Sequence, residues 1–419
     1  MKRLFYTLLF FLPCMLIACG GSDDTPDGDN NPPVVAPPSE EPVDSRLLYN
    51  GIRLPEQWPP VRSSSSELEK GMSPFYLSDK PSVINISVGR QLFVDNFLIE
   101  STNLKRTFYY PEYYSGNPIL TPEQDWEKTG TKGAAFAAPF SDGVWYDEKE
   151  GKYKMWYMAG GGSYATSGAG VTCYAESTDG IHWTKPTLPV VAGTNIVDYN
   201  SERDASVIWL DKQESNASKR YKMFLVARES GKWRYHYKTS PDGKVWRAAV
   251  QSEPIADRST VYKNPFRNVW VYSMRHNVRV DANKLVRARD YNENADPEAG
   301  TKKAEALLSA FWFGPWANEQ HHTDYPNIAP AIYNQDATPY ESIMLGFFSV
   351  WQGPENDVCA SDNVIKRNQV MVGYSRDGYS WFREDMNPFH AVNTTTSDAW
   401  NQGNLQSVAG APLIAEYHV

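Results

Sequence analysis

The chain has 419 residues, a formal net charge of −9 and an aromatic content of 13%, including 14 Trp and 25 Tyr. The negative charge argues against a nucleic-acid-binding protein, because such proteins need a basic face to contact phosphates. The length is ample for one extensive hydrophobic core, and the aromatic content suits both such a core and surfaces that stack on sugar rings.

Residues 1–19 have the pattern of a processing segment. Lys2 and Arg3 precede a 14-residue apolar stretch that ends at Ile17, which is too short to span a membrane. The next residues, ending in Cys19, resemble the bacterial lipobox, in which the cysteine carries lipid. We therefore expect a lipid anchor on Cys19; an ordinary signal peptide with an incidental cysteine is the alternative. The two residues directly after Cys19 are Gly20 and Gly21 and not aspartate, which implies the outer membrane, facing the periplasm or the cell surface.

Residues 20–70 are expected to form a tether, and residues 71–419 the folded domain. From Gly20 to about Glu41 the chain is rich in Gly, Asp, Asn and Pro and has almost no large apolar residue, so it cannot bury a core. Two cysteines, Cys173 and Cys359, remain in the folded domain. A disulfide between them is left open, and no spacing indicates a zinc site.

A Ser-x-Asp-Gly-x-x-Trp motif occurs three times, at residues 177–183, 240–246 and 375–381. The first two copies are 63 residues apart, and the third follows after about twice that distance. A regular period with one degenerate copy indicates a repeat architecture. Each Asp-Gly pair is typical of a tight turn that closes a hairpin, and repeated β units with such a turn predict a propeller. The turn aspartates are therefore expected to be structural.

Two apolar runs precede each turn and are expected to be strands. The inner strands are expected at residues 143–146, 205–210, 259–262 and 328–333. The second strands are expected at residues 153–157, 221–226, 270–274 and 340–348. In the degenerate third repeat, residues 287–293 stand where the turn should be.

We predict an all-β fold, a five-bladed β-propeller with four-stranded blades. The fifth blade would begin at residues 402–408, and an early strand at residues 91–100 would help to close the ring. Only one clear strand follows residue 402, so the last blade is either incomplete or continues beyond this chain.

Polar residues at the starts of inner strands should meet around one mouth of a propeller. Those positions are acidic here, and cleavage of a glycosidic bond needs two carboxyl groups with different protonation states. The carboxyl groups expected to take part in catalysis are those of Asp204, Asp257 and Glu341. The side chains expected to contact substrate are those of Arg203, Arg258, His322, Asp324 and Asp95. The alternative is a set of structural Asp–Arg pairs that join neighbouring blades.

Three stretches resemble the five-bladed propeller glycoside hydrolases: residues 117–126, 151–157 and 174–183. The nearest group is the family 32-like proteins, with more distant kinship to families 43, 117 and 130, and the resemblance covers roughly residues 88–414. It implies a propeller that acts on carbohydrate.

The family 32 motifs are matched in part. Arg203-Asp204-Ala205 approaches the family's Arg-Asp-Pro motif, which implies that Asp204 binds substrate hydroxyl groups and sets the pKa of the other carboxyls. The Asn-Asp-Pro-Asn-Gly nucleophile motif is not matched by residues 137–143. Asp257-Arg258 stands at the blade entry that corresponds to the Glu-Cys acid motif.

The sequence therefore predicts a glycosidase that acts on a poly- or oligosaccharide. A glycan-binding lipoprotein without turnover is the alternative, and a phosphorylase with a basic phosphate pocket is a third reading. We expect carbohydrate as the partner, no nucleic acid, and no cofactor, with an axial Ca²⁺ left open.

Overall fold

The computed structural model describes the part of the chain that folds into sheets, together with a preceding segment. The described residues are 45–63, 72–87, 89–128, 135–165, 170–199, 201–281, 284–306, 309–389, 391–393, 399–410 and 412–413. The expected signal peptide, Cys19 and residues 20–44 of the expected tether lie outside the described residues. Residues 45–63, which we also expected in the tether, instead pack Leu48, Ile52 and Leu54 into the core.

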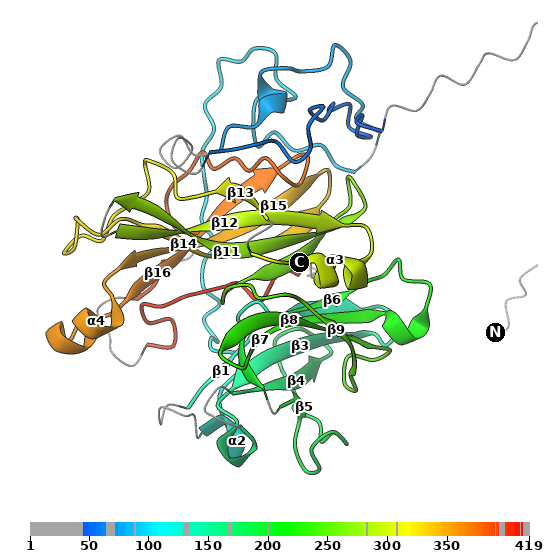
Figure 1. Ribbon diagram of the computed structural model, residues 1–419, viewed down its shortest axis with the longest axis vertical. Helices are drawn as coiled ribbons and strands as arrows, with labels where there is room; N and C mark the ends of the chain where they lie inside the picture. The colour runs from blue at the N-terminus through cyan, green and yellow to red at the C-terminus, as the bar shows by residue number, and fades with distance from the viewer. Residues whose placement is uncertain are drawn as a thin grey trace, which may run out of the picture. The chain divides into compact units, whose positions relative to one another are not determined.

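Four antiparallel sheets follow one another along the chain (Figure 1). The first contains β1 (Ala137–Ala138), β2 (Val144–Asp147), β3 (Lys152–Ala159), β4 (Val171–Ser177) and β5 (Ile196–Asp198). The second contains β6 (Glu202–Leu210), β7 (Tyr221–Glu229), β8 (Lys232–Ser240) and β9 (Arg247–Gln251). The third contains β10 (Thr260–Asn264), β11 (Val269–Asp281), β12 (Lys284–Asn294) and β13 (Ala310–Phe313). The fourth contains β14 (Ala331–Tyr340), β15 (Ile343–Gly353) and β16 (Arg367–Ser375).

Helices are short among the described residues. They are η1 (Phe75–Leu77), α2 (Asp125–Lys128), η2 (Gly162–Tyr164), η3 (Ala217–Lys219), α3 (Pro297–Lys303) and α4 (Asn356–Asp362). Within this part of the chain, no helix is long and apolar enough to cross a membrane.

The first strand of each sheet lies at the centre of the assembly, as in a propeller. The inner strands β2, β6, β10 and β14 contact one another in that order. The ring closes between the fourth and first sheets, where Asn334 Nδ2 donates to Ser141 Oγ at 3.1 Å. The fold is therefore an all-β propeller, as expected.

The prediction of five four-stranded blades is wrong: the described chain forms four blades, and the fourth has three strands. Residues 402–408, expected to begin a fifth blade, form isolated bridges instead. Leu405 N donates to the carbonyl of Asn368 on β16, and Ala409 N donates to the carbonyl of Phe140 beside β1. A single segment thus spans the distance between the fourth and first sheets. Residues 91–100 contain no strand.

The repeated motif forms the turn that we expected. In all three copies the serine hydroxyl accepts from the main-chain N–H of the glycine at 2.9 Å. The aspartate carboxylate also accepts two main-chain N–H groups from the residues after the glycine. The aspartates are therefore structural. In the third blade, residues 287–293 belong to β12, and the connection after this strand holds α3.

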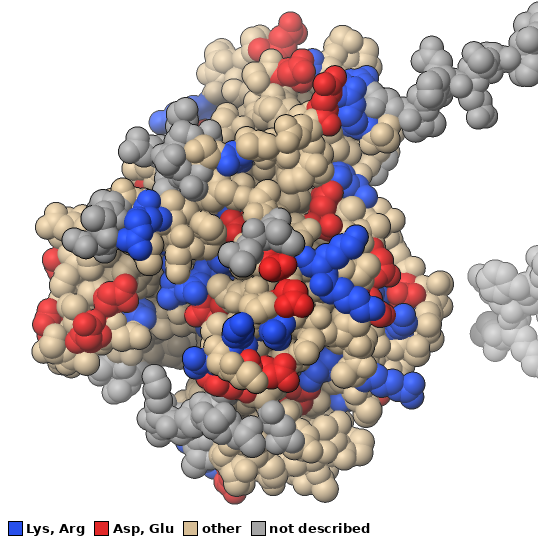
Figure 2. All heavy atoms as spheres, in the orientation of Figure 1, with Lys and Arg blue, Asp and Glu red and all other residues tan. Residues whose placement is uncertain are grey.

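The inner and second strands are apolar because blades pack on both of their faces. The first seven residues of β7 are all buried, whereas the edge strand β9 is almost entirely exposed. On the face shown in Figure 2, acidic and basic side chains are interspersed.

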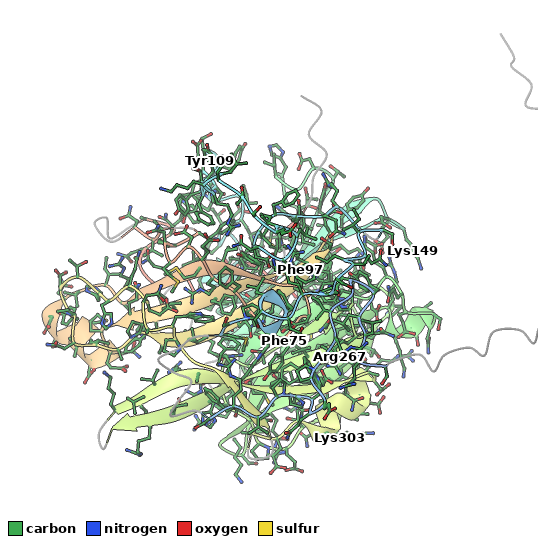
Figure 3. All side chains as sticks on the ribbon, turned by 90° about the horizontal axis from the view of Figure 1, so that it is seen from above. Phe75, Phe97, Tyr109, Lys149, Arg267 and Lys303 are labelled. Carbon is green, nitrogen blue, oxygen red and sulfur yellow. The ribbon has the colours of Figure 1, made fainter. Side chains whose placement is uncertain are left out.

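The segment before the first sheet covers the third and fourth blades. Tyr76 and Phe97 lie in the same hydrophobic cluster as Trp270 and Trp381, and their rings are 5.6 Å apart. Figure 3 shows Phe75 and Phe97 near the middle of this covering segment. Tyr76 Oη accepts from the main-chain N–H of Arg376 at 3.3 Å, so this part of the segment contacts the end of the blades where the Ser-x-Asp-Gly turns lie. Farther along the chain, α2 reaches the other end of the first blade, where Gly161 N donates to the carbonyl of Trp126.

Candidate active site

The candidate site lies at the end of the propeller where the inner strands begin, which we call the mouth. Residues 139–142, 203–204, 257–258 and 331–333 form it, one group from each blade. Because the inner strands run in the same direction, residues far apart in sequence meet here. The structure brings Arg203, Asp204, Asp257 and Arg258 together here, as the contacts below show.

Arg258 is the centre of the mouth. Its main-chain N–H donates to Asp204 Oδ2 at 2.7 Å, and its Nε is 3.5 Å from Asp204 Oδ1. Its carbonyl accepts from Arg289 Nη1 at 2.8 Å. The φ angle of Arg258 is +57°, in the left-handed region that a non-glycine residue rarely adopts. These contacts hold the strained backbone in place, and such strain is concentrated at functional sites.

Asp257, the residue before Arg258, pairs with a different arginine. Its Oδ1 lies 2.8 Å from Nε of Arg275 on β11. Burial lowers the pKa of Arg275, and the carboxylates of Asp257 and Asp204 oppose this shift, so both carboxylates act on one guanidinium. The side chains of Asp204 and Asp257 are 20% and 26% exposed, so each can be reached from solvent.

A pocket of about 180 Å³ opens beside this cluster. Its walls come from the extended β11–β12 hairpin, the start of β14, the end of β15 and the residues next to α4. The lining residues are Arg275, Asn277, Leu285, Arg287, Ala331, Tyr333, Trp351, Glu355 and Lys366. Tyr333 and Trp351 supply aromatic faces of the kind that stack on sugar rings, and the remaining polar side chains can form hydrogen bonds with hydroxyl groups.

A buried ion pair between Arg203 and Asp142, which the sequence did not predict, lies below the surface of the mouth. Arg203 Nη2 donates to both carboxylate oxygens of Asp142, at 2.8 and 3.0 Å, and Arg203 Nη1 donates to Thr172 Oγ1 at 2.6 Å. Asp142 is fully buried, and burial raises its pKa to about 6 although Arg203 acts in the opposite direction. Asp142 is therefore enclosed and joins the first and second blades. Arg203, which we expected to contact substrate, is 4% exposed and serves this pair.

Glu341 does not lie at the mouth. It stands in the turn between β14 and β15, at the other end of the blade, where its Oε1 pairs with Arg90 Nη2 at 2.7 Å. A second strand starts where the first one ends, so its first residues are a full strand length from the mouth. The expectation that Glu341 stands beside Asp204 and Asp257 is therefore wrong.

Asp95 also lies at the end opposite the mouth. It is 1% exposed and pairs with Arg376 Nη2 at 2.9 Å, in the turn of the third motif copy. This contact fixes the covering segment to the fourth blade.

His322 and Asp324 lie outside the cluster, near the start of β16. His322 Nδ1 accepts from the main-chain N–H of Asp324 at 3.1 Å. Burial and the charge of Arg367 lower the pKa of His322. Among the described contacts, neither residue touches Asp204 or Asp257.

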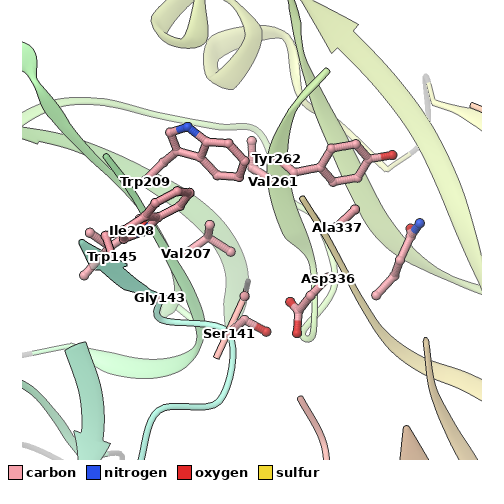
Figure 4. A pocket seen from close by; sticks show the side chains of 12 residues that line it. Ser141, Gly143, Trp145, Val207, Ile208, Trp209, Val261, Tyr262, Asp336 and Ala337 are labelled. Atoms are coloured by element: carbon pink, nitrogen blue, oxygen red, sulfur yellow. The ribbon is translucent and has the colours of Figure 1, made fainter. Parts of the chain in front are cut away.

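A cavity of about 10 Å³ lies among the inner strands, at the axis of the propeller. Figure 4 shows the carboxylate of Asp336 pointing toward Ser141. The hydroxyl of Ser407 donates to Asp336, and burial raises the pKa of this carboxyl. The cavity is about the size of one water molecule, so it is too small to hold a sugar ring.

No group of three or more His, Cys, Asp or Glu side chains suited to a metal ion occurs in the described ranges. Cys173 and Cys359 are free, so they form no disulfide with each other.

Comparison with known proteins gives matches among solved structures alone. No family model matches the chain, and no curated protein matches it. The solved structures similar to it include glycoside hydrolases of propeller type. A fructofuranosidase variant from Schwanniomyces occidentalis, complexed with fructosylnystose, is 14% identical with a TM-score of 0.41, over 64% of this chain. A candidate glycoside hydrolase from Parabacteroides distasonis is 13% identical with a TM-score of 0.41, over 69% of this chain and 84% of its own.

An enzyme of another class is similar to the same degree. An N-acetylgalactosamine deacetylase from F. plautii, in complex with blood group B trisaccharide, is 11% identical with a TM-score of 0.40, over 66% of this chain and 75% of its own. The chain spans 47% of the length of the fructofuranosidase. At these identities and scores the similarity assigns no activity, so function has to be argued from the mouth itself.

Proposed function

We propose that the mouth binds a poly- or oligosaccharide and hydrolyses a glycosidic bond. The observation that carries this proposal is the pair of partly exposed carboxylates, Asp204 and Asp257, on either side of Arg258 and next to an aromatic-walled pocket. The reaction needs one carboxyl group to protonate the leaving oxygen and another to attack the anomeric carbon or to activate water. One water molecule is consumed, and a new reducing end is formed.

Two arginines position these carboxylates. Arg258 holds Asp204 through its main-chain N–H and its guanidinium, and Arg275 holds Asp257 through Nε. A carboxylate fixed by such contacts is preorganised for the reaction, which lowers the cost of reaching the reactive geometry. Tyr333, whose ring lies 5.6 Å from the guanidinium of Arg258, provides a wall against which a sugar ring can pack.

The test is release of reducing ends from a panel of neutral, uronic and sulfated polysaccharides, with purified chain from residue 20 onward. Asp204→Asn and Asp257→Asn should each abolish release without unfolding the protein. Glu341→Gln, at the opposite end of the fourth blade, is the matched control and should keep its activity. Loss of activity in the control, or full activity in both Asp variants, would contradict the proposal.

A glycan-binding protein without turnover is the second candidate. One observation favours it: each mouth carboxylate already has an arginine partner, as the carboxylates of structural ion pairs do. Retarded migration in a gel that contains one polysaccharide, with no release of reducing ends from any, would support this function over hydrolysis.

We also propose that the mature chain is held at the outer membrane by lipid on Cys19. The lipobox-like residues before Cys19 support this. Cys19→Ala should move the protein from the membrane fraction to the soluble fraction, and protease treatment of whole cells should tell whether it faces the surface or the periplasm. Membrane retention of the alanine variant would argue against the anchor.

A further inference from the structure

The mouth pocket carries positive charge that the rest of the described chain does not neutralise. Three cationic side chains line it, Arg275, Arg287 and Lys366, and Glu355 is the one acidic residue in the wall. Arg275 is paired with Asp257. No ion pair joins Arg287 or Lys366 to a carboxylate within the described residues. Although the chain has a net charge of −9, this basic pocket creates a local positive potential that attracts anions.

The geometry of Arg287 indicates a group prepared for a ligand. Its guanidinium lies 4.6 Å from the ring centroid of Tyr333, on the wall of the pocket. Its Nη1 is buried and has no hydrogen-bond partner in the described structure. A buried N–H donor without a partner is costly, and a ligand that accepts from it removes that cost.

Arg258 repeats this arrangement on the same ring. It is 7% exposed, its guanidinium lies 5.6 Å from the Tyr333 centroid, and its Nη1 lacks a hydrogen-bond partner among the described groups. Its other nitrogens are engaged, because Nη2 donates to Gln406 Oε1 and Nε faces Asp204, and Arg258 is not among the residues that line the pocket. Two guanidinium groups therefore share one tyrosine. Stacking fixes the plane of a guanidinium, and the planar N–H edge of Arg287 matches the two oxygens of a carboxylate or sulfate.

We propose that this pocket binds the acidic group, a carboxylate or a sulfate, of a carbohydrate. The inference rests on the proposed function for the choice of carbohydrate, and it adds the substrate class. Arg275 lines the pocket and also pairs with Asp257 at 2.8 Å, so one side chain separates the acidic group from the carboxylate proposed to act in catalysis. The acidic sugar unit would thus lie next to the bond that is cleaved.

The experiment compares oligosaccharides that differ only in charge. Dissociation constants are measured for a uronic oligosaccharide and its carboxyl-reduced form, and for a sulfated oligosaccharide and its desulfated form. We expect the acidic member of one pair to bind on the order of tenfold more tightly, and this advantage to shrink as NaCl is added. The pair that shows the advantage tells carboxylate from sulfate.

Two variants that each remove one positive charge show where the preference for the acidic oligosaccharide arises. Arg287→Gln should remove the preference for the acidic member. Arg247→Gln, at an exposed position of β9 on the outer edge of the second blade, should keep it. A thermal melt of each variant checks that the fold is retained. Lys366→Gln removes a second positive charge from the pocket and tests the same preference.

Equal affinity for both members of both pairs overturns the inference, as does an equal loss in Arg247→Gln. Binding of inorganic phosphate that depends on Arg287, with no preference among the sugars, also overturns it, because the pocket would then serve phosphate. The outcomes separate the two proposals: release of reducing ends without acidic preference keeps the hydrolase and removes the acidic site. Tight acidic binding without release supports the acidic site and contradicts the hydrolase.

Discussion

Arg258 joins the second and third blades by donating its main-chain N–H to the Asp204 carboxylate at 2.7 Å. Arg258 adopts φ of +57°, so the backbone turns just before β10. This turn directs the main-chain N–H of Arg258 toward Asp204. The same turn sends the guanidinium toward Phe140 of the first blade, at 5.2 Å, and Tyr333 of the fourth, at 5.6 Å. One strained residue therefore contacts each of the other three blades.

The backbone and the side chain of Arg258 can be tested separately. Arg258→Gly keeps the left-handed φ and the N–H bond to Asp204, whereas Arg258→Ala adds the strain of a side chain in that conformation. We expect both variants to lose binding at the mouth, and the alanine variant to be the less stable by about 1 kcal/mol. Urea unfolding measures the difference. An alanine variant as stable as the glycine variant would show that strain at this position is unimportant.

The pKa of Asp142 predicts how stability changes with pH. The folded value, about 6, lies above the ordinary value of 3.8, because the carboxyl is buried. The folded state therefore binds this proton more tightly than the unfolded state does. The stabilisation that protonated Asp142 gives to the folded state is therefore complete below about pH 4. It is lost as pH rises through 6, which lowers the free energy of unfolding by roughly 3 kcal/mol.

Other buried carboxyl groups also contribute to the pH dependence of stability, so the measurement has to be a difference. Burial raises the pKa of Asp290 and Asp336 as well. Urea unfolding of the wild type and of Asp142→Asn between pH 4 and 7 isolates the contribution of Asp142 to the pH dependence of stability, because the variant cannot titrate at this position. The difference in stability between the two proteins should change over this range, with the wild type losing more as pH rises. A constant difference would mean that Asp142 does not titrate there.

The ion pair between Asp95 and Arg376 should contribute to stability and not to activity. Both side chains are buried, 1% and 2% exposed, so Asp95→Ala leaves an unpaired guanidinium and should cost about 3–5 kcal/mol. The KM for substrate should not change, because the pair lies at the end opposite the mouth. Thermal unfolding and steady-state kinetics measure the two effects. A raised KM with unchanged stability would instead restore the substrate-binding role expected from sequence.

Much of the propeller could be predicted from sequence because its signals are local. Aromatic strands and Asp-Gly turns depend on neighbouring residues, and all three motif copies form the same turn. The number of blades is not a local property. Residues 402–408 have the polarity of a strand, but they pair in isolated bridges, with Asn404 alongside Asn368 of β16. Nothing in their own sequence distinguishes these two outcomes.

The sequence predicts the position of a residue where topology alone decides it. Asp204, the third residue of β6, and Asp257, just before β10, both stand at the start of an inner strand, so a propeller has to bring them to one mouth. Glu341 was misplaced because the start of a second strand was treated like the start of a first strand. Arg275 and Arg287 were missed because they lie within the long β11–β12 hairpin, whose extension past the mouth has no sequence signal.

The three motif glycines offer a graded test of how each turn is packed. Gly180, Gly243 and Gly378 have nearly equal φ values, +77°, +78° and +75°, so alanine adds the same backbone strain, about 1 kcal/mol, to each. Their surroundings differ. A Cβ on Gly180 would come no closer than 3.8 Å to Tyr153, whereas it would meet Trp156 at 2.4 Å on Gly243 and Asn264 at 2.2 Å on Gly378.

Gly180→Ala should therefore lower the free energy of unfolding by the strain alone, and the other two substitutions by a further 1–3 kcal/mol from overpacking. Gly378→Ala should have the largest effect, because Asn264 is buried and its Nδ2 donates to the carbonyl of Asp377 at 2.8 Å. Moving the amide to make room would break this bond. Urea unfolding of the three variants gives the order. Equal losses would show that the turns relax freely and that backbone strain alone sets the cost.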